Sequence, residues 1–197
     1  MSTAPLSKAD LRRQVRERLR AVPAEELSEW SQQIVQRLMA RGDFWARPGT
    51  VSLFGGLRNE PDLITALLPW LRSRGWKTAL FAMEGVELHA YEVTGDHDLE
   101  RGSLGVWVPV ISRCRPIPPE ELTLILVPGL AFSHTDGARL GRGGGFYDRF
   151  LDLPAVKAAR LGLCFEAQVL QEIPREPHDA CVPTLITEQK ERSWPAV

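Results

Sequence analysis

The residues with the greatest potential for chemistry lie in a glycine-dense segment in the second half of the chain. From Gly137 to Gly145, five glycines occur together with Arg139 and Arg142. Glycine tolerates positive φ and carries no side chain that would keep an anion away from backbone N–H groups. A helix expected to begin near Phe146 would add unpaired N–H donors and a partial positive charge. The segment therefore predicts a phosphate-binding loop, with a tight turn that binds nothing as the alternative.

Other motifs for phosphate binding and catalysis do not fit this region. A P-loop requires a Gly-Lys pair, which the sequence does not contain. A dinucleotide fingerprint that began at Gly141 would need a further glycine at the position of Phe146. Ser133 and His134 lack the G-x-S-x-G surroundings of a hydrolase nucleophile. The loop therefore indicates a phosphate site of another kind.

Two carboxylates could connect such a phosphate to a metal ion. Asp148 falls in the first turn of the expected helix, where it would repel a bound phosphate unless a cation lay between them. Mg²⁺ binds one or two carboxylates together with phosphate oxygens, so Asp148 is a candidate ligand. Asp179, in a loop after Pro177 and His178, could supply the second carboxylate. The alternatives are that Asp148 complements the helix dipole and that Asp179 is a surface loop residue.

Hydrophobic periodicity predicts the elements that must position the loop. Apolar residues at three- and four-residue steps indicate a helix over 8–22 and a second one from Pro23 to Gly42. The apolar run 122–127, just before the loop, lacks alternation and predicts a strand buried on both faces. Further strands are expected at 51–54, 78–82, 88–93, 106–110, 161–165 and 185–187, and further helices at 61–75 and from 146 onward. Such alternation predicts a single α/β domain over residues 1–197, a three-layer α/β/α fold with a mostly parallel central sheet, helices on both faces and an N-terminal helical pair.

Composition narrows the class of protein. The 24 Lys and Arg against 25 Asp and Glu give a net charge of −1, which argues against nucleic-acid binding driven by bulk charge. Apolar runs stay far below the roughly 18–20 residues of a membrane span. Three separated cysteines without a CxxC spacing predict reduced thiols and a cytoplasmic location. The expected first helix is basic, which leaves an RNA-binding module or a mitochondrial presequence as weaker interpretations.

The sequence RLGRGGGFYDRFL at 139–151 resembles the signature of the 5-formyltetrahydrofolate cyclo-ligases, also called 5,10-methenyltetrahydrofolate synthetases. Other matching pieces follow in the family's order: Lys8, Leu11 and Arg12; Glu60 after the first strand; VPGLAF at 127–132; GLCFEAQ at 162–168; Pro177–Asp179; and Ile186–Glu188. The resemblance covers nearly the whole chain. It implies an ATP- and Mg²⁺-dependent ligase that converts 5-formyltetrahydrofolate to 5,10-methenyltetrahydrofolate, ADP and phosphate.

The resemblance also implies which residues form the site. Arg142 would be catalytic, because it would stabilise the transferring charge. The implied ATP ligands are Lys8, Arg12, Arg139, Leu140, Gly141, Arg142, Gly143, Gly144, Gly145, Phe146 and Tyr147, although a core position is favoured for Tyr147. The implied folate contacts are Leu57, Glu60, Arg142 and Phe146, and the implied Mg²⁺ ligands are Asp148 and Asp179. The expected partners are ATP and a reduced folate, without nucleic acid or membrane, in a monomer or weak homodimer.

The chain departs from the family pattern at four positions, namely Met83, Val108, Ser133 and Pro183. These departures fall mainly on the folate half of the pattern, whereas the nucleotide half is well kept. Two alternatives follow from this difference. One is a divergent ATP-binding homologue that acts on another small acid, and the other is a non-catalytic nucleotide-binding regulator.

Overall fold

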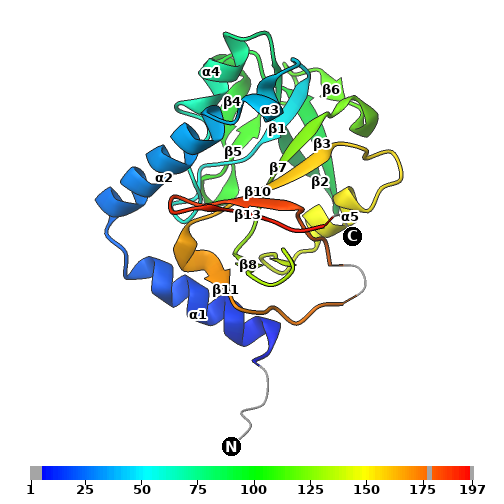
Figure 1. Cartoon of the computed structure of the whole chain (residues 1–197). Coiled ribbons are helices and arrows are strands. Elements are labelled where there is room, and N and C mark those ends of the chain that lie inside the picture. The colour runs from blue at the N-terminus through cyan, green and yellow to red at the C-terminus, as the bar shows by residue number, and fades with distance from the viewer. Residues whose placement is uncertain (1–5, 177–178, 196–197) are drawn as a thin grey trace, which may run out of the picture.

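A central eight-stranded sheet organises the molecule (Figure 1). The computed structural model describes residues 6–176 and 179–195, without the side chain of Leu104. Across the sheet the strands are β13 (Glu191–Ser193), β12 (Thr184–Ile186), β10 (Ala159–Leu163), β7 (Leu124–Pro128), β1 (Thr50–Leu53), β2 (Lys77–Glu84), β3 (Glu87–Glu92) and β6 (Pro116–Ile117). The five from β12 to β2 are parallel, and β13, β3 and β6 pair antiparallel at the edges. The mostly parallel α/β sheet is thus confirmed.

The central strands are buried on both faces, as the unbroken apolar sequence of β7 predicts. All four residues of β1 are buried, as are four of the five residues of β7. In the pairing of β10 with β7, Leu161 lies opposite Leu126 and Gly162 opposite Val127. Alternate side chains of these strands point to opposite faces, so each face needs its own apolar cover.

Three helices share one apolar core with the same face of the central sheet. They are α1 (Lys8–Arg20), α2 (Ala24–Met39) and α4 (Leu67–Arg72), and their buried side chains join one apolar core with β1, β7 and β10. Leu11, Val15 and Leu19 form the buried stripe of α1 at four-residue steps. Figure 1 shows α1 beside β11 (Val169–Leu170), beyond the main sheet, where it packs against the 3-10 turn η4 (Glu166–Gln168). The N-terminal helical pair is therefore present.

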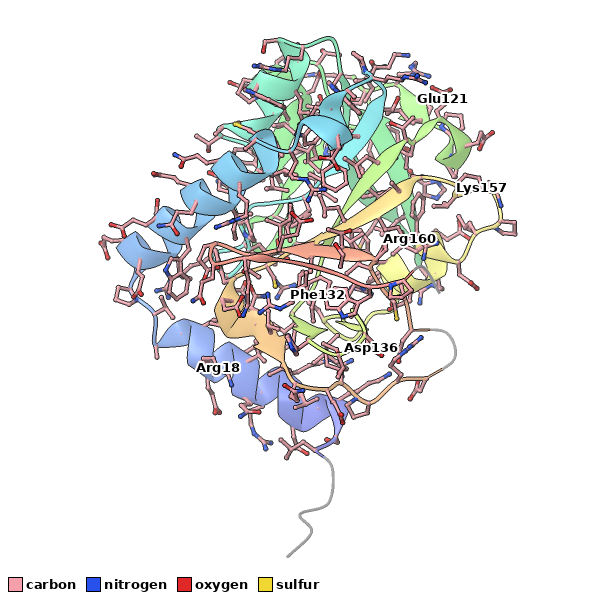
Figure 2. All side chains as sticks on the ribbon, in the orientation of Figure 1. Arg18, Glu121, Phe132, Asp136, Lys157 and Arg160 are labelled. Carbon is pink, nitrogen blue, oxygen red and sulfur yellow. The ribbon has the colours of Figure 1, made fainter. Side chains whose placement is uncertain are left out.

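The opposite face carries a second core under a single short helix, α5 (Phe146–Leu151). Phe150 and Leu151 of α5 pack with Ile125 and Val127 of β7. Phe132, which is fully buried, also belongs to this core and lies in the interior (Figure 2). The predicted helix after the glycine loop is thus present, and both faces of the sheet carry helices.

Two small sheets position the loops at the carboxyl end of the parallel strands. One joins β11 to β8 (Ala131–Ser133) and β8 to β9 (Arg139–Leu140), so β9 leads directly into the glycine loop. The other is the hairpin of β4 (Leu99–Arg101) and β5 (Trp107–Pro109). The remaining short elements are α3 (Gly42–Trp45) and the 3-10 turns η1 (Asp96–Asp98), η2 (Ser103–Gly105) and η3 (Pro119–Glu121).

The helix expected over 61–75 is shorter, because α4 begins only at Leu67. Before α4, the Asp62 carboxylate accepts hydrogen bonds from the N–H groups of Ile64 and Thr65, which fixes a turn that competes with helix. Pro69 then lies in the first turn of α4, where its missing N–H costs little. In the described part of the chain, no helix combines the length and apolarity that crossing a bilayer requires.

Candidate active site

The glycine loop has the backbone geometry that its composition predicts. Gly143 has a φ of +115°, and Gly145, immediately before α5, has a φ of +64°. A Cβ placed on Gly143 would meet nothing within 4 Å, so this glycine is required by conformation and leaves open space beside the backbone. The loop can therefore admit a ligand close to its main chain.

Arg139 anchors the base of this loop from inside the protein. Its guanidinium donates from Nη2 to Asp148 Oδ1 at 2.7 Å and from Nη1 to the Pro128 carbonyl at 3.2 Å. The Arg139 side chain is 5% exposed and that of Asp148 is 14% exposed. The N–H of Ala180 donates to the same Asp148 oxygen. This buried ion pair connects β9, α5 and the segment around residue 180.

Arg142 reaches from the loop to the opposite wall of the site. Its Nη2 lies 2.8 Å from Glu60 Oε1 and 3.3 Å from Asn59 Oδ1. The Glu60 side chain is 7% exposed, whereas that of Arg142 is 36% exposed. Burial raises the pKa of the Glu60 carboxyl, and the Arg142 charge only partly opposes this rise. The predicted catalytic arginine and the predicted folate-contacting carboxylate are thus partners.

Both residues line an apolar cleft of about 360 Å³. Its walls include Leu53, Phe54, Phe81, Val106 and Trp107, with Arg139 and Arg142 at the loop side. An elongated ligand with a flat ring system fits such walls, because apolar surfaces bury its faces and a few polar groups fix its orientation.

The predicted site residues divide into those that line this cleft and those that lie behind it. The lining members are Leu57, Glu60, Arg139, Gly141, Arg142, Gly144, Gly145, Phe146 and Tyr147. Tyr147 also packs into the core, with its ring 5.5 Å from that of Phe81. The residues that do not line the cleft are Lys8, Arg12, Leu140, Gly143, Asp148 and Asp179.

Two of these outlying residues join α1 to the loop and to the segment around residue 179. Lys8 Nζ lies 2.6 Å from Asp179 Oδ2, and Arg12 Nε donates to the Gly141 carbonyl at 2.9 Å. Their four-residue spacing places both cations on one face of α1. The helix therefore brings Arg12 to the glycine loop and Lys8 to Asp179.

Sequence reasoning missed several aromatic and apolar walls of the cleft. Phe54, Phe81 and Trp107 were not singled out, although Trp107 stands out as a large aromatic side chain in a polar, loop-rich stretch. Met83 and Val108, two departures from the family pattern, also line the cleft. The divergence noted from the sequence thus bears directly on the ligand-facing surface.

Asp148 and Asp179 line a separate pocket of about 410 Å³ behind the loop. Each carboxylate already has a cationic partner, Arg139 and Lys8 respectively. Within the described ranges, no group of three or more His, Cys, Asp or Glu side chains is arranged to hold a metal ion. The shared pocket is compatible with a two-carboxylate Mg²⁺ site completed by phosphate oxygens, so the metal assignment stays a prediction.

Replacing Glu60 with glutamine should stabilise the fold at neutral pH. A carboxyl whose pKa is raised on folding contributes stability that is present below its unfolded pKa and is lost as the pH rises through the folded value. A glutamine side chain does not ionise, so the variant avoids this loss of stability. Its carbonyl oxygen can still accept the hydrogen bond from Arg142. We expect the Tm at pH 7.5 to rise by about 2–4 °C, or ~1 kcal/mol, and the gain to vanish near pH 4. A gain that persists at pH 4 would contradict this cause.

Comparison with known proteins decides the family. The family model described as the 5-formyltetrahydrofolate cyclo-ligase family matches residues 5–188. The chain belongs to this family. A 5-formyltetrahydrofolate cyclo-ligase of Escherichia coli (strain K12) is 27% identical over 183 residues, covering 91% of this chain and 100% of that protein. Another, from Mycolicibacterium smegmatis, is 44% identical over 70 residues, a stretch that spans 36% of each chain.

The structural comparison agrees with this membership. The NMR structure of Aquifex aeolicus 5,10-methenyltetrahydrofolate synthetase is similar with a TM-score of 0.81 at 30% identity, over 96% of this chain and 94% of that one. Cyclo-ligases are enzymes of the ligase class. The family and the fold that the sequence predicts are therefore both confirmed.

Proposed function

We propose that this chain converts 5-formyltetrahydrofolate to 5,10-methenyltetrahydrofolate, consuming ATP and releasing ADP and phosphate. The observation that carries the proposal is the 2.8 Å ion pair between Arg142 and Glu60. This pair joins a glycine loop suited to phosphate to the wall of an apolar cleft suited to a folate ring. Transfer of a phosphoryl group to a folate requires these two surfaces side by side. Membership of the cyclo-ligase family supports the same reaction.

The chemistry explains why the site offers charges rather than a nucleophile. The formyl group on N5 is an amide, whose resonance makes its carbon a poor electrophile. In the proposed reaction the formyl oxygen takes the γ-phosphoryl group of ATP and ADP leaves. N10 then forms a bond to the formyl carbon and loses its proton to solvent, and the C–O bond breaks as phosphate departs with its electron pair. Phosphoryl transfer of this kind depends mainly on positioning and on neutralising charge.

Each residue of the site has a role in this proposal. Arg142, released from Glu60 when substrate enters, stabilises the charge on the transferring phosphoryl group. The Glu60 carboxylate accepts hydrogen bonds from N–H groups at the edge of the pterin ring, while Leu57 and Phe146 pack against the ring. Lys8 and Arg12 bind phosphate oxygens from the side of α1, together with residues 139–147 of the loop.

The proposal includes one Mg²⁺ ion, which Asp148 and Asp179 would hold. When bound, the ion would neutralise part of the ATP phosphate charge. The two carboxylates fit because they line one pocket and because the N–H of Ala180, next to Asp179, donates to Asp148. Lys8 and Arg139, which hold these carboxylates in the structure, keep the excess negative charge compensated.

Replacing Asp179 with asparagine should weaken metal use. Loss of one of two carboxylate ligands is expected to raise the Mg²⁺ concentration for half-maximal rate by about 10-fold or more, since carboxylates supply most of the attraction for this hard cation. The measurement is the initial rate over a Mg²⁺ titration, with a melting curve of the variant as a control for folding. An unchanged titration would remove Asp179 from the metal site.

The proposed activity has a direct optical test. Methenyltetrahydrofolate absorbs in the near ultraviolet, so the purified chain mixed with 5-formyltetrahydrofolate, ATP and Mg²⁺ should produce this band. Omitting ATP should abolish it. ATP hydrolysis or binding without the band would reject the proposed substrate.

A second candidate is favoured by the cleft lining. Met83 and Val108 depart from the family pattern at the ligand-facing surface, which suits a homologue that phosphorylates a different small acid. The optical assay separates the two, because only a folate substrate gives the band. The three cysteines are free thiols, so the proposal places a monomer or weak homodimer in the cytoplasm.

A further inference from the structure

An arginine covers one face of the tryptophan that lines the cleft. The guanidinium carbon of Arg101 lies 3.7 Å from the centroid of the Trp107 ring, which is a stacking distance. Arg101 and Trp107 are directly opposite each other in the pairing of β4 with β5, so both side chains leave the hairpin on the same face. The proposed function gives neither residue a role.

Hydrogen bonds hold this stack to the turn after β1. The N–H of Trp107 donates to the Gly55 carbonyl at 3.0 Å. Arg101 Nη1 donates to the Gly105 carbonyl at 2.6 Å and lies 3.5 Å from the carbonyl oxygen of Gly56. A Cβ on Gly56 would lie only 2.6 Å from the Trp107 nitrogen, so the hairpin backbone rests directly on this turn. The backbone of Trp107 and the guanidinium beside its ring are therefore both fixed.

The Trp107 ring lies at the border between the cleft and a neighbouring groove. The groove, of about 630 Å³, lies between α2 and residues 56–66. Leu57, Glu60 and Trp107 line both the groove and the cleft. Among the described lining residues, Arg101 belongs to the groove and not to the cleft. The guanidinium thus covers the groove side of the ring, which leaves the other face of the ring to the cleft.

This arrangement orients the tryptophan rather than burying it. Trp107 is half-buried and Arg101 is exposed, so the stack contributes little to the core. The negative quadrupole of an indole face attracts a cation, and the planar guanidinium stacks on it more closely than an ammonium can. A flat ring system can then pack in an offset manner on the free face of the indole.

We infer that Arg101 is a positioning residue for the folate ring system, on which it acts through Trp107. The inference rests on the proposed function, because that proposal puts the pterin ring of a reduced folate against Leu57 and Glu60. These two residues share the border of the cleft with Trp107. Arg101 fixes the plane of the indole, and the free face of the indole packs against the ring system. We expect folate binding, and not ATP binding, to depend on this stack.

The first test separates folate binding from turnover. KM for 5-formyltetrahydrofolate, KM for ATP and kcat are measured in the natural chain and in Arg101→Gln. We expect the folate KM to rise about 5-fold, the size of a partly exposed cation–π contact, while the other two constants stay within about 2-fold. Arg101→Lys keeps the charge but loses the planar stack, so it should recover part of the loss. A natural folate KM in Arg101→Gln, or an equal rise of the ATP KM, overturns the inference.

A second arginine–tryptophan stack provides a matched control. The guanidinium carbon of Arg74 lies 4.0 Å from the centroid of the Trp70 ring, and here too the arginine is exposed and the tryptophan half-buried. Trp70 is not among the described residues that line the cleft. Arg74→Gln should therefore keep the natural folate KM. A rise as large as that of Arg101→Gln would mean that loss of any such stack has this effect, and it would reject the positioning role.

A double-variant cycle tests whether Arg101 acts through Trp107. Trp107→Leu keeps an apolar side chain but removes the ring, so the folate KM should rise. Adding Arg101→Gln to Trp107→Leu should then change the folate KM by less than about 2-fold, because the group through which Arg101 acts is already gone. If the two effects multiply instead, Arg101 acts by another route and the inference fails.

Calorimetric titration with 5-formyltetrahydrofolate in the absence of ATP separates this inference from the proposed function. Weaker binding to Arg101→Gln than to the natural chain and to Arg74→Gln supports the inference even if no methenyl band forms. Absence of binding to the natural chain, or equal binding to the natural chain and Arg101→Gln, rejects it. A methenyl band together with an unchanged folate KM in Arg101→Gln would support the proposed reaction and reject the role of Arg101.

Discussion

Replacing Arg142 with alanine should lower kcat by more than 10-fold in the optical assay. The Arg142 guanidinium lines the cleft, as does that of Arg139, and one fixed charge-assisted contact in a transition state is worth roughly 2–4 kcal/mol. The Arg142 side chain is 36% exposed, but its loss leaves the 7% exposed Glu60 carboxyl without its cation, so some loss of stability is expected and a melting curve accompanies the assay. At temperatures where it remains folded, the variant should bind ATP and turn over slowly.

Two further variants make the Arg142 result specific. Arg142→Lys keeps the positive charge but loses the planar fork, so a partial recovery of kcat would indicate that charge matters and geometry adds to it. Arg113→Ala removes an exposed arginine that donates to the His97 carbonyl, and it should leave kcat unchanged. An Arg142→Ala enzyme with the natural kcat would exclude this arginine from phosphoryl transfer.

The largest loss of stability is expected from Asp148→Asn. This change leaves the Arg139 guanidinium buried at 5% exposure without its carboxylate. Removing one partner of a buried ion pair costs about 3–5 kcal/mol, because the remaining charge stays desolvated. Chemical denaturation of the natural chain and the variant measures the difference in the free energy of unfolding.

A double-variant cycle tests the cause of that loss. Arg139→Met/Asp148→Asn removes the stranded charge, so it should be more stable than the sum of the single changes predicts, by about 0.5–3 kcal/mol. Strict additivity would mean that the pair does not act as a unit. Because Asp148 is also a proposed metal ligand, its Mg²⁺ titration is interpretable only at temperatures where the variant remains folded.

The elements with strong periodicity were predictable from the sequence. The apolar stripe of α1 and the unbroken apolar sequence of β7 each reflect a surface that must be buried, and this property is local. The positive φ of Gly143 and Gly145 follows from composition in the same way. The family signature then added Glu60 and Arg142, which the structure brings together although they lie 82 residues apart.

What could not be predicted depends on contacts between distant segments. Strands β8, β9 and β11 contain only two or three residues each, too few for a periodic signal, and they exist because they pair with one another. Trp107 reaches the cleft because the β4–β5 hairpin folds back there. The Arg139 side chain points into the protein because its guanidinium donates to Asp148 and to the Pro128 carbonyl. The sequence alone does not show that these two groups lie beside Arg139.

The ion pair between Lys8 and Asp179 joins residues that are 171 positions apart. During synthesis, the first helix leaves the ribosome long before the segment around residue 179, and β12, which pairs with β10, follows later still. A nascent chain thus cannot complete the proposed nucleotide site until translation has passed these residues. Binding of ATP or Mg²⁺ at the proposed site therefore cannot stabilise the early stages of folding during synthesis. The apolar core of the parallel strands must form without a bound ligand.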